Sequence, residues 1–176
     1  MSQKAWEAAE KSNLPKFYLN LKAYKKSLLS NSNPYTPAVN LVFALDEALK
    51  MMREEGLDNI FFRHNKHKLA MSNAVKALNL KLFADEKYLS PSITAIKTEG
   101  MDAEEFRKTI KNNFDILLAG GQDHLKGEIF RVGHLGYVND RDIITVIAAI
   151  SNTLLDLGQI SSQQAGKALE EASKYL

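Results

Sequence analysis

The residues best suited to chemistry lie between Ala119 and Tyr137, in the segment AGGQDHLKGEIFRVGHLGY. Within this segment Arg131 follows an apolar, strand-like run and precedes the glycines Gly133 and Gly136. A charged side chain in apolar sequence is normally paired, and a guanidinium is a planar fork that matches a carboxylate. Glycines let a ligand approach the backbone. The pattern predicts either a carboxylate-binding arginine at Arg131 or a structural salt bridge to a neighbouring helix, and the residues alone do not separate the two.

The histidines are weaker candidates. His64 and His67 have the one-turn spacing of helical metal ligands, but the chain has no cysteine and lysines flank both, so we interpret them as a solvated helix face. His124, beside Asp123, is predicted to belong to a loop pair. His134 receives no role from the sequence.

Two further patterns are rejected. The KGE segment after the glycine pair has the wrong spacing for a phosphate loop, and no Ser or Thr follows Lys126. Lysines interleave with aromatics before residue 27, as in single-stranded nucleic-acid binders. The overall formal charge is only +2, so solvated lysines around an apolar stripe are the better interpretation.

Composition narrows the class of protein. A chain of 176 residues is long enough for one domain with a sizeable core. The absence of cysteine excludes disulfides, thiolate metal sites and cysteine nucleophiles. The N-terminus does not resemble a signal peptide, and the longest apolar run, around Ile143 to Ile150, is too short to span a membrane. We therefore expect a cytoplasmic protein with no membrane or nucleic-acid partner.

Periodicity and breakers predict the elements. Residues 1–36 have an irregular pattern, and the prolines of NSNPYTP interrupt the chain before a long helical pattern begins at Ala38. Gly56 separates this helix from a second one that reaches Leu78. Short strands are expected at Lys81–Ala84, Ile93–Lys97, Asp115–Leu118 and Glu128–Val132. Further helices are expected after Asp102, with Glu105 in capping-box spacing, from Asn139 or Asp140, and after Ser161, which is capped with Gln164. This order predicts an α+β two-layer domain, with a small, mainly antiparallel sheet of about three or four strands and helices on one face.

The segments NPYTPAVNLVFALDEALKMMREEGLDN and AGGQDHLKGEIFRVGHLGY resemble the small C-terminal domain of class V pyridoxal-phosphate (PLP) aminotransferases. The resemblance is to the alanine–glyoxylate and serine–pyruvate group, which includes cyanobacterial proteins called soluble hydrogenase small subunits. It implies the C-terminal domain of a fold type I PLP enzyme. Residues 1–36 would be a linking segment and residues 37–176 the small domain, with the N-terminal PLP-binding domain absent from this chain.

The resemblance also implies roles for individual residues. Arg131 matches the arginine that pairs with the substrate α-carboxylate. Thr36 matches a residue that reaches the cofactor phosphate of the other subunit, and Tyr35 beside it is a second cofactor-binding candidate. Gly120 and Gly121 match a turn that shapes the domain against the cofactor cleft.

The family lysine that forms the Schiff base has no counterpart in the chain. Lys4 follows Ser-Gln as that lysine often does, but it continues into AWEAAEKS rather than the Pro-Pro-Gly segment of the family. We therefore expect no catalytic residue here, no PLP bound by this chain alone, and no metal.

The full-length protein is expected to be a homodimeric transaminase acting on small amino and keto acids such as alanine, serine, glyoxylate and pyruvate. The alternative is a non-catalytic, stand-alone domain for carboxylate binding, docking or oligomerisation.

Overall fold

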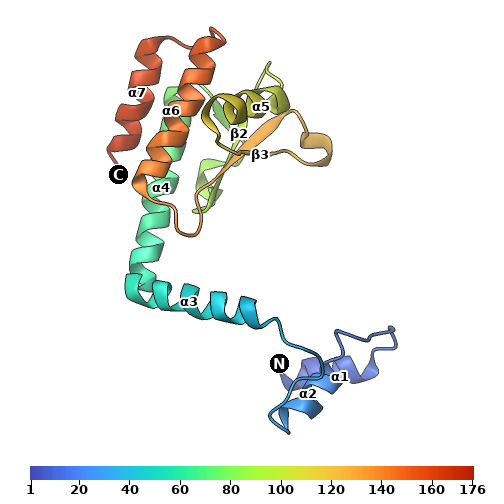
Figure 1. The fold of residues 1–176 in the computed structure, drawn as a ribbon. Coiled ribbons are helices and arrows are strands. Elements are labelled where there is room, and N and C mark those ends of the chain that lie inside the picture. The colour runs from blue at the N-terminus through green and yellow to red at the C-terminus, as the bar shows by residue number, and fades with distance from the viewer. The chain divides into compact units, whose positions relative to one another are not determined.

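The computed structural model describes residues 1–176, which form two compact units, Met1–Glu54 and Glu55–Leu176 (Figure 1). We call them the N-terminal and C-terminal units and describe each by itself. The boundary predicted at residue 36 separates a linking segment from the small domain of the family that the sequence resembles. The division into two units does not test it, so it stays a prediction.

The N-terminal unit is helical. Helix α1 spans Gln3–Lys11 and α2 spans Leu21–Leu28, and the irregular sequence pattern of residues 1–36 did not predict these two helices. The local signals were caps, since the Ser2 and Asn20 side chains accept hydrogen bonds from the first-turn amides of these helices. The third helix, α3, spans Val39–Glu55 and begins after NSNPYTP as predicted.

Helix α3 has apolar side chains around most of its circumference, yet none of its residues is buried. Leu41 and Phe43 are 71% and 70% exposed, and six other large apolar side chains of the helix are exposed as well: Val39, Val42, Leu45, Leu49, Met51 and Met52. Contiguous exposed apolar surface of this kind marks an interaction site.

The C-terminal unit contains a four-stranded antiparallel sheet in the order β1-β2-β4-β3. Its strands are β1 (Lys81–Leu82), β2 (Ile93–Lys97), β3 (Ala119–Gly120) and β4 (Ile129–Gly133). The predicted α+β class and antiparallel sheet are therefore confirmed.

Helices cover one face of this sheet. Helices α4 (Leu57–Ala77) and α5 (Ala103–Phe114) contact its strands, whereas α6 (Asp140–Asp156) and α7 (Ser162–Ser173) pack against the other helices, with α4, α6 and α7 side by side (Figure 1). Ile96, Phe130 and Val132 face this layer and are buried in one core cluster. Because side chains alternate along a strand, Ala95 and Arg131 lie on the opposite face, which no helix of the unit covers.

Helix caps follow the sequence closely. Asp102 caps α5 through the Glu104 amide, although the predicted capping box with Glu105 does not form. Asn139 begins α6 with a capping box, and Ser161 with Gln164 forms the box expected for α7. No helix combines the length and apolar character needed to cross a membrane.

The predicted strand Asp115–Leu118 was wrong. Asp115 takes a left-handed backbone conformation and ends α5, and the strand pairing falls on Ala119 and Gly120 instead. An apolar run indicated burial here but not which residues pair, because pairing is decided by register against β4.

Gly121 is required by a close backbone approach. A Cβ atom at this position would overlap the Leu125 carbonyl oxygen and would lie 3.1 Å from Ile129 Cγ1. The Leu125 carbonyl belongs to the short 3-10 helix η2 (Asp123–Leu125) that carries the chain from β3 to β4. The glycine therefore lets this connection fold back tightly against the sheet.

We predict that Gly121→Ala lowers the free energy of unfolding by about 1–3 kcal/mol, because backbone rather than a movable side chain meets the new methyl group. Gly166→Ala is the matched control: it lies inside α7 with open space around its Cα and should raise stability by about 0.5–1 kcal/mol. Urea denaturation of both variants tests this, and equal stability changes would contradict the packing argument.

Candidate functional site

Arg131 lies at the centre of β4, paired with Ala95 on one side and Ala119 on the other. Its side chain is half-buried on the sheet face that the helices leave open. Its Nε donates a hydrogen bond to the Gly120 carbonyl oxygen at 2.9 Å, and Arg131 forms no ion pair within the chain. The structural-salt-bridge alternative is therefore not what the structure contains. The two terminal nitrogens make no hydrogen bond within the chain, so their four N–H donors are available.

The position of the accepting carbonyl follows from the strand register. Gly121 N donates to Ile129 O at 3.1 Å, so the neighbouring Gly120 peptide points away from β4, toward the open edge of the sheet. The Arg131 side chain crosses β3 to reach this unused carbonyl. The hydrogen bond fixes the guanidinium plane and leaves its outer edge directed away from the backbone.

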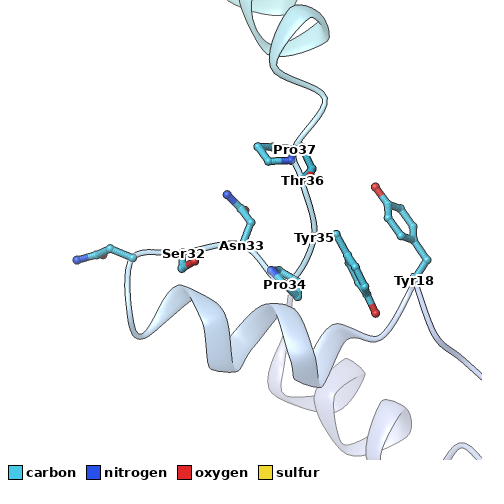
Figure 2. A pocket seen from close by; sticks show the side chains of 8 residues that line it. Tyr18, Ser32, Asn33, Pro34, Tyr35, Thr36 and Pro37 are labelled. Carbon is cyan, nitrogen blue, oxygen red and sulfur yellow. The ribbon is translucent and has the colours of Figure 1, made fainter.

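Tyr35 and Thr36 belong to the N-terminal unit. They line an open hollow of about 890 Å³ together with residues of the adjoining loop, Asn31, Ser32, Asn33 and Pro34 (Figure 2). Tyr35 stacks on Tyr18 with ring centroids 4.9 Å apart, and its hydroxyl donates to Phe17 O at 2.8 Å. Thr36 is exposed and its hydroxyl has no partner within the protein.

The hollow fits only part of a PLP molecule. The Thr36 hydroxyl is available to a phosphate oxygen, whereas the Tyr35 hydroxyl is already engaged with backbone. No lysine or arginine lines the hollow, so the charge that a phosphate requires would come from elsewhere. The residues present therefore suit one edge of the cofactor.

His134 follows Arg131 by three residues and is fully buried. Its Nε2 is hydrogen-bonded to the Thr94 hydroxyl at 2.8 Å, and its backbone N–H donates to Ser92 O at 2.9 Å. Burial, assisted by the neighbouring His67, lowers the pKa of His134 to about 4. His134 is thus a neutral core residue that ties the end of β4 to β2.

His67 corrects the expectation of a solvated histidine pair. It is fully buried, and its Nε2 donates to Asp140 Oδ1 at 2.8 Å while Lys66 Nζ donates to Asp140 Oδ2 at 2.7 Å. Burial lowers the pKa of His67 despite this hydrogen bond. His64 is half-buried and bonds to Ile60 O. The one-turn spacing of His64 and His67 did not indicate that α6 would cover His67.

The loop between β4 and α6 is held by Arg63, which the sequence did not single out. Its Nη1 donates to Gly136 O at 2.9 Å and to Val138 O at 3.0 Å, and it forms a bidentate pair with Glu55 at 2.5 and 2.9 Å. The pKa of Glu55 is lowered by the hydrogen bonds from Arg63. No motif identifies such a residue, because its partners are backbone carbonyls more than 70 positions away.

Curated relatives share much of the sequence. The chain is 54% identical over 158 residues to the soluble hydrogenase 42 kDa subunit of Anabaena cylindrica, covering 90% of this chain and 41% of that protein. It is 49% identical over 176 residues to the soluble hydrogenase small subunit of a Synechococcus strain, covering 100% and 46%. It is 34% identical over 183 residues to the serine–glyoxylate aminotransferase of Methylorubrum extorquens, covering 100% and 45%. No protein-family model matches the chain.

Solved structures share the fold. The ureidoglycine–glyoxylate aminotransferase of Bacillus subtilis matches with a TM-score of 0.85 at 30% identity, over 96% of this chain and 44% of that one. The pyridoxamine–pyruvate aminotransferase of Mesorhizobium loti matches with a TM-score of 0.89 at 25% identity, over 99% and 45%.

In sequence and in fold, the chain corresponds to the C-terminal part of the class V PLP aminotransferases, as the resemblance indicated. It spans less than half the length of the relatives it matches.

We predict that stability falls as the pH is lowered from about 6.5 to about 4. Unfolded His134 binds a proton near its ordinary pKa, whereas folded His134 resists protonation until about pH 4, so acid favours the unfolded state. The effect of this one group is about 3 kcal/mol across that window. Urea denaturation of His134→Gln, which keeps a polar group near Thr94, should show a flatter dependence on pH. The exposed His124→Gln is the control, and an equal flattening in both would contradict the assignment.

Proposed function

We propose that this chain is the C-terminal part of a PLP-dependent aminotransferase that acts on small amino and keto acids. In this proposal Arg131 holds the substrate carboxylate. The observation that carries it is the state of Arg131: half-buried on an uncovered sheet face, fixed through Nε, and without an acidic partner in the chain. The relatives and structural neighbours are named for pairing serine, ureidoglycine or pyridoxamine with glyoxylate or pyruvate, which supports substrates of this size.

The geometry supports an end-on grip. Since Nε donates to Gly120 O, a carboxylate would receive its two parallel hydrogen bonds from Nη1 and Nη2. Such a bidentate charged pair contributes on the order of 2–3 kcal/mol net of desolvation. The grip would fix the substrate Cα relative to the protein, which favours reaction by orientation.

PLP, when bound, would act as the electron sink for the reaction. From this chain, Thr36 would donate its hydroxyl to the phosphate of the partner subunit's cofactor, which requires a homodimer. Tyr35 would contact the cofactor through its ring, because its hydroxyl is hydrogen-bonded to Phe17 O. The Schiff-base lysine and the rest of the cofactor pocket would be supplied by an N-terminal domain.

The non-catalytic alternative is favoured by α3, whose apolar side chains are exposed along its length. A docking or oligomerisation domain would use this surface directly. In that case sedimentation equilibrium of the chain would show self-association that Phe43→Glu abolishes, and Arg131 substitutions would not change the kinetics of any protein containing the chain.

We predict that Arg131→Lys raises the KM for the keto acid about thirtyfold or more in the complete enzyme, because lysine keeps the charge but loses the fork. The fall in kcat should be smaller. The control is Arg141→Lys, at an exposed position in the first turn of α6. Steady-state kinetics measure both, and equal KM values for the two variants would refute the proposed role of Arg131.

A further inference from the structure

Two arginines approach the edge strand β3 from opposite faces of the sheet. Arg131 reaches Gly120 O across the uncovered face. Arg107, on α5, approaches from the helix-covered face, and its Nε donates to Leu118 O at 2.8 Å. The Gly120 carbonyl points away from β4 and Leu118 directly precedes β3, so two carbonyls at this open edge of the sheet are taken by arginine side chains.

Arg107 is itself fixed. Its Nη1 donates to Glu104 Oε1 at 2.8 Å, one turn earlier on α5, and its side chain is only 22% exposed. The pair lies directly over Gly120: a Cβ added there would be 2.5 Å from both Arg107 Nη1 and Glu104 Oε1. The glycine therefore serves this contact, since its backbone has an ordinary φ and a methyl group would have to displace the ion pair.

We propose that Arg107 is a positioning residue for the carboxylate grip. It anchors β3 to α5, and β3 in turn presents the Gly120 carbonyl that orients Arg131. A two-residue edge strand has few ladder hydrogen bonds beyond the one from Gly121 N to Ile129 O, so the anchor helps to set where that carbonyl lies. The kinetic consequence rests on the proposed function, whereas the structural link between Arg107 and Arg131 does not.

The link is tested first on the chain itself by NMR of the Arg131 Nε–H group. We expect a slowly exchanging proton in the unaltered chain, and exchange faster by about fivefold or more in Arg107→Met. Lys174→Met is the matched control, because Lys174 also forms an i,i+3 ion pair, with Glu171 at 2.7 Å on α7. Unchanged exchange in Arg107→Met would overturn the inference.

The kinetic test uses the complete enzyme. Arg107→Met should raise the KM for the keto acid by about fivefold to tenfold with kcat changed less than about twofold, because orientation rather than charge is lost. Arg107→Lys, which can still reach either Glu104 or Leu118 O, should restore part of the KM. Lys174→Met should leave both constants unchanged, which separates positioning from a general loss of stability.

A double-mutant cycle adds a direct test of the contact. Gly120→Ala should raise KM by displacing the ion pair, and this effect should largely disappear in an Arg107→Ala background. Additive effects would contradict the inference.

The outcomes also separate the two proposals. If Arg131→Lys raises KM but Arg107→Met alters neither KM nor Nε–H exchange, the positioning role is wrong and the carboxylate grip stands. If Arg107→Met changes Nε–H exchange while Arg131→Lys leaves KM unchanged, the link is real and the grip is wrong.

Discussion

The hydrogen bond from Arg131 Nε to Gly120 O is the interaction on which the candidate site depends. A guanidinium on an uncovered sheet face would otherwise sample many rotamers, and its orientation would cost entropy each time a ligand bound. The hydrogen bond to a backbone carbonyl uses one donor, fixes the plane of the group and leaves the four N–H bonds of the terminal nitrogens without a partner in the chain. A carboxylate neighbour would have fixed it as well, but would have neutralised it.

The rest of the C-terminal unit holds the strands around that bond. On one side, Gly121 allows the β3–β4 connection to fold back against Leu125. On the other, buried neutral His134 joins the end of β4 to Thr94, and Arg63 bonds the carbonyls of the following loop. These polar contacts are directional, which gives a defined geometry where apolar packing alone would allow sliding. The open face of the sheet can therefore remain uncovered without the strands losing their register.

The N-terminal unit buries little of its own apolar surface. None of the residues of its first two helices is buried, and α3 exposes its apolar side chains. Its aromatic side chains form a small, partly exposed cluster in which Tyr35 contacts Phe17, Tyr18 and Tyr24. A segment that buries so little of its own apolar surface gains stability mainly from what it contacts. This is consistent with a chain that spans less than half the length of its relatives.

The sequence by itself determined the fold class, the long helices and most caps, because apolar periodicity and capping residues act within a few positions of the chain. It also identified Arg131 as the candidate ligand-binding group, since an arginine in an apolar strand is unusual on its own. It did not locate β3, the burial of His67, or Arg107 and Arg63. The Glu104–Arg107 spacing was visible as an i,i+3 pair, but not its contact with Leu118. These features depend on register and on which helix covers which face, and both are decided only when distant segments pack together.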